Sequence, residues 1–151
     1  RFLVAFITES GARLMANPLR EAAARGVPVT ILTGTYLCNT EPYALEYLIE
    51  KVGPTLELRV YAETGRSFHP KAYFFDLPNE SEVFISSANL SWTALTTGVE
   101  WSYRLHRSLA PHDYKQFDEE YQRLLTDHSL PVTKDFLREY WREWKARNRD
   151  S

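Results

Sequence analysis

The stretch "SFHPKAYFFD", residues 67–76, decides the fold of this chain and contains its clearest candidate site. Its apolar second half predicts a strand over residues 71–76, in which successive side chains point to opposite faces. His69 and Lys71 are two residues apart, so they are predicted to project from one face. Pro70 cannot donate to a ladder hydrogen bond, which indicates that the strand starts here or is partly unpaired. The alternative is that His69 and Lys71 form the solvated face of a half-buried strand.

The residues before this stretch alternate between strand-like and helix-like patterns. Apolar runs and period-2 alternation predict strands over residues 1–7, 27–34 and 55–63. Helical faces are predicted over residues 8–26 and 42–53, and Pro18 predicts a kink or a break in the first helix. A strand, helix and strand in succession imply a parallel pair with a right-handed crossover, so the chain is predicted to be an α/β domain.

The residues after this stretch predict a hairpin and then two helices. Turn residues 77–81 lead into a strand over residues 82–86, and alternation within residues 96–105 predicts one more strand. The helices are predicted over residues 111–125 and 133–148. The second helix carries an aromatic stripe of Phe136, Tyr140, Trp141 and Trp144 between basic residues. Such a stripe is typical of packing against the domain or a dimer partner, and the alternative is contact with a phosphate backbone or base stacking.

Composition and charge limit the class of protein. The chain has 151 residues, of which 44% are hydrophobic and 25% charged, as in an ordinary globular domain. No run is long enough for a membrane span, so we expect a soluble, cytoplasmic protein. A single cysteine, Cys38, excludes an intrachain disulfide framework. The formal net charge of −2 gives no global attraction to nucleic acid, so such binding would need a local basic cluster.

Polar residues with a characteristic spacing extend beyond His69 and Lys71. The stretches "FHPKAYFFD", "ISSANLS" and "GVEW" resemble the signature of the phospholipase D superfamily. That signature is His-x-Lys, an aspartate after four further residues, a Gly-[Gly/Ser]-x-Asn turn and then an acidic residue. The match covers Phe68 to Trp101, and its one departure is Ser86, which stands where the motif has its first glycine.

The resemblance implies a role for each matching residue. The family's roles transfer to this chain as a nucleophile at His69, phosphate ligands at Lys71, Ser87 and Asn89, a partner that orients the histidine at Glu100, and a structural aspartate at Asp76.

The resemblance also implies the architecture. We expect one phospholipase D-like domain over residues 1–151, with a mixed, largely parallel sheet flanked by helices on both faces. Because the chain opens inside an apolar run without a methionine, we interpret it as a fragment of a larger protein of the helicase or restriction type.

Phosphodiester chemistry explains why these residue types occur together. A phosphodiester is an anion that repels nucleophiles, and a lysine such as Lys71 can neutralise it. One contact at about 4 Å and an effective dielectric constant near 20 is worth on the order of 4 kcal/mol. Neutral imidazole is a competent nucleophile, and a carboxylate such as Glu100 on its other nitrogen would fix its tautomer.

The count of motif histidines predicts a dimer. The leaving oxygen needs a proton, and one histidine cannot attack as a base and donate as an acid in the same step. The family uses two copies of the motif per site, whereas this chain carries one, so we expect a two-fold homodimer. His106, His112 and His128 have no such partner and are interpreted as surface or helix-end histidines. No metal or other cofactor is expected, since lysine and asparagine do the work of a cation.

The predicted function is a metal-independent nuclease of the branch associated with restriction endonucleases and with modules at the N-terminus of helicases. Its expected partners are nucleic acid, chiefly DNA, a second copy of the chain and a fused helicase or DNA-recognition domain, with no membrane. One alternative is a module that docks DNA or dimerises without catalysis. The other is a phospholipid phosphodiesterase, which an apolar funnel beside the site would favour, whereas an electropositive trough would favour DNA.

Overall fold

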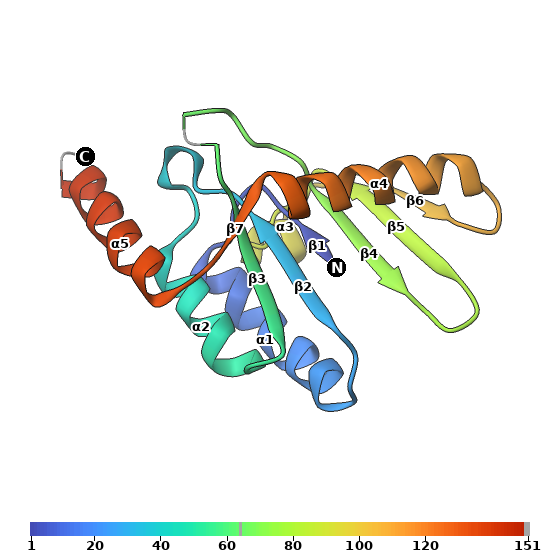
Figure 1. Cartoon of the computed structure of the whole chain (residues 1–151), viewed down its shortest axis with the longest axis horizontal. Helices are drawn as coiled ribbons and strands as arrows, with labels where there is room; N and C mark the ends of the chain where they lie inside the picture. The colour runs from blue at the N-terminus through green and yellow to red at the C-terminus, as the bar shows by residue number, and fades with distance from the viewer. Residues whose placement is uncertain (64, 150–151) are drawn as a thin grey trace.

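The structure is a computed structural model that describes residues 1–63 and 65–149. Its centre is a seven-stranded sheet with the strand order β6-β5-β4-β1-β2-β3-β7 (Figure 1). The strands are β1 (Phe2–Leu3), β2 (Val29–Thr33), β3 (Leu56–Tyr61), β4 (Ala72–Asp76), β5 (Ser81–Ser86), β6 (Ser102–His106) and β7 (Ser129–Pro131). The helices are α1 (Glu9–Ala24), the 3-10 turn η1 (Tyr36–Cys38), α2 (Pro42–Val52), α3 (Trp92–Leu95), α4 (Pro111–Asp127) and α5 (Lys134–Arg149).

The strand pairing confirms a mixed sheet but corrects the expectation that it is largely parallel. In the described part of the chain, β1 with β2 and β2 with β3 are parallel, and the other four pairs are antiparallel. The parallel pairs are those joined through α1 and α2. Strands β4 and β5 are joined by a turn of only residues 77–80, which is too short for a crossover and imposes an antiparallel pair.

Alternate side chains of the strands feed two apolar layers, one on each face of the sheet. Phe2, Ile31 and Tyr73 belong to the layer shared with α1 and α2, and Tyr140 of α5 joins it. Their strand neighbours Leu3, Leu32 and Phe74 belong to the layer beneath α4. Figure 1 shows α4 crossing the strands, with α1 and α2 lying together away from it. Helices therefore cover both faces, as predicted.

Three local details differ from the expectations. Helix α1 runs through the exposed Pro18 to Ala24, so the break expected there does not occur. The strand expected over residues 96–105 begins only at Ser102, as β6. Strand β7 was not predicted, because Ser129–Pro131 is only three residues long and ends in proline.

The residues of the candidate site lie at the edge of the sheet formed by the ends of the strands. Strand β4 runs antiparallel to β1 and begins beside Leu3, where β1 ends. Strand β5 ends and β6 begins at this same edge, since Ser86 pairs with Ser102. Strand β3 ends here at Tyr61, so the carboxyl ends of the parallel strands and the turns around β4, β5 and β6 meet.

Candidate active site

His69 and Lys71 lie immediately before β4, at this edge of the sheet. His69 is exposed and Lys71 is half-buried. The Lys71 ammonium donates to the His69 carbonyl oxygen at 2.9 Å, which uses one of its three hydrogens and holds it beside the histidine. The Lys71 carbonyl in turn accepts from the Ser86 N–H at 3.0 Å. The strand pairing thus fixes this pair against the end of β5.

The turn that follows β5 is closed by Ser86, the residue that departs from the motif. The Ser86 hydroxyl accepts from the Ala88 N–H at 3.0 Å and from the Ser102 hydroxyl at 2.8 Å. Among the described non-glycine residues, only Leu37 and Cys38 have positive φ, so the backbone at Ser86 does not require glycine. The side-chain hydrogen bonds of serine therefore close a turn that the motif builds with glycine.

Asn89 is held by the segment that joins β1 to α1. Its side chain is 8% exposed, and its Oδ1 accepts from the Phe6 N–H at 3.1 Å. The Nδ2 hydrogens have no acceptor among the described residues, so they are available to a ligand. An amide fixed in this way presents its donors in one orientation, as binding of a phosphate oxygen requires.

Ser87 and Glu100 form a second polar pair at the start of β6. The Ser87 hydroxyl donates to the Glu100 carboxylate and accepts from the Trp101 N–H at 2.9 Å. The described residues include no hydrogen bond between Glu100 and the ring of His69. The orienting role of Glu100 and the phosphate contact of Ser87 therefore stay predictions.

Asp76 lies at the far end of β4 from His69 and connects the sheet to α4. Its carboxylate accepts from Arg1 at 2.9 and 3.1 Å and from the Tyr114 hydroxyl at 3.2 Å. Burial opposes its ionisation, but the hydrogen bonds and charge of Arg1 outweigh burial and lower the pKa of Asp76. Such contacts fit the structural role predicted for this residue.

Two tyrosines that the sequence did not single out support the site. The ring of Tyr36, in η1, meets the His69 ring edge to face with centroids 6.0 Å apart. The Tyr73 hydroxyl donates to the Ala88 carbonyl at 2.6 Å, which ties β4 to the turn that carries Asn89. Burial, and then the negative charge of Glu100, raise the pKa of Tyr73. Their spacing in the sequence gives no signal, because both contacts depend on the tertiary fold.

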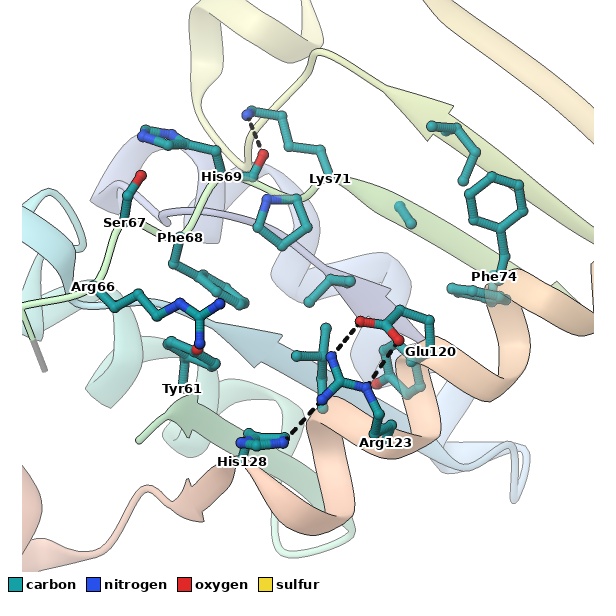
Figure 2. Close-up of a pocket in the computed structure, with 17 residues that line it drawn as sticks. Tyr61, Arg66, Ser67, Phe68, His69, Lys71, Phe74, Glu120, Arg123 and His128 are labelled. Carbon is teal, nitrogen blue, oxygen red and sulfur yellow. Dashed lines mark hydrogen bonds and ion pairs between the residues drawn. The ribbon is translucent and has the colours of Figure 1, made fainter. Parts of the chain in front are cut away.

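A pocket of about 440 Å³ opens beside His69 and Lys71, between α4 and the sheet. Figure 2 shows Tyr61, Arg66 and Phe68 on one side of it and Glu120, Arg123 and His128 on another. His128 follows α4 as a helix-end histidine, as predicted, but it is half-buried and bonded to Glu63 and Arg123. The sequence missed the pocket because α4 lies about fifty residues from the motif.

The described residues contain no group of three or more histidine, cysteine, aspartate or glutamate side chains placed to hold a metal ion. None of the helices in residues 1–63 and 65–149 is long and apolar enough to cross a membrane.

The family whose description is "Cardiolipin synthase, PLD-like domain" matches residues 2–125, which contain every predicted site residue. This chain belongs to the phospholipase D superfamily of phosphodiesterases. The resemblance to this superfamily inferred from the sequence is thus confirmed.

Solved structures show the same superfamily fold. Nuc from Salmonella typhimurium, a phospholipase D family member, is 21% identical with a TM-score of 0.64, and the alignment covers 89% of this chain and 81% of Nuc. NucT from Helicobacter pylori is 18% identical with a TM-score of 0.62, and the alignment covers 87% of this chain and 80% of NucT. No protein with a curated description matches this chain.

Proposed function

We propose that this superfamily member is a metal-independent phosphodiesterase that cleaves nucleic acid through a phosphohistidine at His69. The observation that carries the proposal is the exposed His69 beside the Lys71 ammonium, which lies 2.9 Å from the His69 carbonyl oxygen. The donors of Lys71 and Asn89 supply the positive field that a phosphodiester needs before attack. The resemblance in fold to Nuc and NucT, whose names point to nucleases, is consistent with nucleic acid as the substrate.

The reaction has two displacements at phosphorus. A neutral nitrogen of His69 attacks phosphorus, the P–N bond forms and the bond to the leaving oxygen breaks. The partner copy's equivalent histidine gives its proton to that oxygen. The partner copy's histidine, now neutral, then takes a proton from water. The water oxygen attacks phosphorus, and the P–N bond to His69 breaks. Lys71 and Asn89 contact the non-bridging oxygens in both steps, where negative charge accumulates.

A second copy of the chain is the proposed source of the second histidine. Exposed apolar side chains flank Glu100 before the edge strand β6 and at its start; Val99 is 93% exposed, Trp101 83% and Tyr103 70%. Contiguous exposed aromatic side chains are typical of interfaces between proteins. Burial of this surface in a two-fold dimer would place two copies of the site next to each other. A fused helicase or restriction-type domain is proposed on the motif resemblance alone.

The experiment is cleavage of supercoiled plasmid and of single-stranded DNA in excess EDTA. We expect the wild-type protein to cleave and His69→Ala to lose activity, whereas His112→Ala, an exposed histidine on α4, retains it. A denaturant-quenched reaction analysed by mass spectrometry should show the nucleotide adduct on the peptide that contains His69. Chelator-sensitive cleavage, or full activity of His69→Ala, would overturn the mechanism. DNA binding without cleavage by any variant would favour the docking module.

A phospholipid phosphodiesterase is the second candidate, because the matching family is described by cardiolipin synthase and the pocket beside His69 has an apolar floor. It shares the same chemistry and differs in the substrate. Release of headgroup from phosphatidylglycerol vesicles, assayed with the same three proteins, separates the two candidates. Headgroup release that depends on His69, with no DNA cleavage, would establish the lipid enzyme.

A further inference from the structure

The pocket between α4 and the sheet is continuous with the candidate active site. His69, Pro70 and Lys71 line one end of it, and residues of α4 line the other. Its volume of about 440 Å³ lies within the usual range for sites that hold small ligands. A substrate whose phosphate lies on Lys71 therefore has an opening next to it that the two-step chemistry does not use.

The inner surface of this pocket is apolar and includes a fixed aromatic pair. Leu3, Ala72 and Phe74 of the sheet line it, and Phe68 stacks on Tyr61 with ring centroids 4.5 Å apart and planes 16° apart. Phe68 is 6% exposed and stacked on Tyr61, so it supports the half-buried Tyr61 and holds that ring in place. The accessible part of the Tyr61 ring is an aromatic surface on which a flat heterocycle can stack.

The rim of the pocket carries guanidinium groups that are already positioned. Arg66 donates to the Glu63 carboxylate at 2.9 Å, and Arg123 donates to both oxygens of Glu120. Arg123 also contacts the His128 Nε2 at 2.9 Å, and the His128 Nδ1 lies 3.0 Å from Glu63. Because Arg123 donates to Nε2, the His128 proton resides on Nδ1 and is donated to Glu63.

This rim favours a polar, anionic strand over a lipid chain. Four charged residues line the pocket, namely Lys71, Arg66, Arg123 and Glu120, and three of them are cations. Each arginine has five N–H donors and spends only some of them on its glutamate, so donors remain for a phosphate. An acyl chain would gain nothing from this rim, whereas a nucleotide has an aromatic ring for Tyr61 and a phosphate for the cations.

We infer that this pocket binds one unpaired nucleobase of the strand whose phosphodiester lies on Lys71, and that the substrate is therefore single-stranded. The inference rests on the proposed function and names its substrate class. A paired base is stacked and bonded within its duplex, and it would have to leave both to enter a space enclosed by α4 and residues 66–70. A base of an unpaired strand has no base pair to break before it enters the pocket.

The test measures binding rather than cleavage, so it does not depend on turnover. The full chain carrying His69→Ala is titrated in EDTA against a fluorescein-labelled single-stranded deoxyoligonucleotide, its blunt duplex, and the same strand with abasic sites. We expect the single strand to bind at least tenfold more tightly than the duplex or the abasic strand. Leu124→Trp, which fills the pocket from α4, should lose at least tenfold for the single strand and little for the abasic strand.

Two matched controls separate the pocket from general effects. Leu130→Trp adds the same side chain on β7, outside the pocket, and should bind as the parent does. Arg123→Gln should weaken binding of the single strand several-fold, whereas Arg142→Gln should not, although Arg142 is also paired with a glutamate three residues before it. If circular dichroism shows that Leu124→Trp does not fold, the comparison of Arg123→Gln with Arg142→Gln decides the test.

The results distinguish this inference from the proposed function. Equal affinity for single strand and duplex, or a Leu124→Trp protein that binds like its parent, would overturn the base pocket, even if His69 remains essential for cleavage. Loss of binding to phosphatidylglycerol vesicles in Leu124→Trp, with DNA binding unchanged, would overturn it in favour of an acyl chain. Failure of the proposed function would instead appear in the cleavage assay as activity that survives His69→Ala.

Discussion

At the scale of single residues, the Lys71 side chain is already in position to contact a phosphate beside His69. Its ammonium already lies 2.9 Å from the His69 carbonyl and has two hydrogens left for a phosphate. We expect Lys71→Gln to lower kcat/KM by about 10²- to 10³-fold, as removal of one preorganised donor does in other enzymes. Steady-state cleavage in EDTA measures this, with Lys115→Gln, an exposed lysine of α4, as the control. A loss of less than threefold would mean that Lys71 does not contact the phosphate.

Tyr73 is the second residue with a testable role. Tyr73→Phe keeps the ring but leaves the Ala88 carbonyl without its hydrogen bond, which should cost about 1–2 kcal/mol of unfolding free energy. Because Ala88 precedes Asn89, we also expect kcat to fall. Urea denaturation and initial rates measure the two effects, and Tyr43→Phe, whose hydroxyl is exposed, serves as the control. Unchanged stability and rate would show that the turn does not depend on this bond.

Sequence reasoning found some of these residues and missed others for one physical reason. His69, Lys71 and Asn89 are separated by short intervals that a strand and a turn fix locally, so their spacing carries a signal. Tyr36 and Arg123 reach the same site from η1 and α4 through packing of the whole chain. Nothing in their local sequence distinguishes them from ordinary surface residues.

At the scale of elements, the hydrogen bonds in the turn after β5 predict how substitutions of Ser86, the residue that departs from the motif, change stability. Ser86→Ala should lose the bonds to the Ala88 N–H and the Ser102 hydroxyl, with a cost of about 1 kcal/mol. Ser86→Gly restores the motif residue, yet it should be no more stable than Ser86→Ala, because φ here is not positive and glycine adds chain entropy. Thermal unfolding of the two variants beside the wild type checks this. A glycine variant more stable than Ser86→Ala would contradict it.

The contact of Asp76 with Arg1 and α4 predicts how the stability of the protein depends on pH. The folded pKa of Asp76 is below its ordinary value of 3.8, so its ionised form is stabilised by folding. This stabilisation is complete above the ordinary pKa and is lost as the pH falls through the folded pKa. We expect Asp76→Asn to cost about 1 kcal/mol at pH 7 and less at pH 3. Urea unfolding at both pH values tests this, and Asp135→Asn, in an exposed pair with Arg138, should show no such difference.

The elements themselves were mostly predictable, whereas their directions were not. Helices α1, α2, α4 and α5 and the hairpin of β4 and β5 follow from periodicity and turn residues. The direction of β4 beside β1 does not, because the ten residues that join β3 to β4 have no periodic pattern from which direction could be inferred. The sheet was therefore expected to be more parallel than it is.

At the scale of the whole molecule, the exposed surface at β6 predicts the oligomeric state. Trp101→Glu and Tyr103→Glu should convert a dimer to a monomer in sedimentation at micromolar concentration, and specific activity should fall with dilution. Leu130→Glu, on the opposite edge strand and 53% exposed, is the matched control and should remain dimeric. A wild-type protein that sediments as a monomer yet cleaves DNA would contradict the shared site.

The two edge strands of the sheet, β6 and β7, also differ in whether another chain could pair with them. Strand β7 is three residues long and ends in Pro131, which offers no N–H to a neighbouring chain, whereas β6 carries the exposed ring of Tyr103 and directly follows the exposed Trp101. A chain that could join its β6 edge to the β7 edge of the next copy would polymerise into open filaments. Among the described strands, β6 alone is proposed to pair with another copy, and β6-on-β6 pairing would close after two copies, so high concentration should yield a finite particle and no fibres.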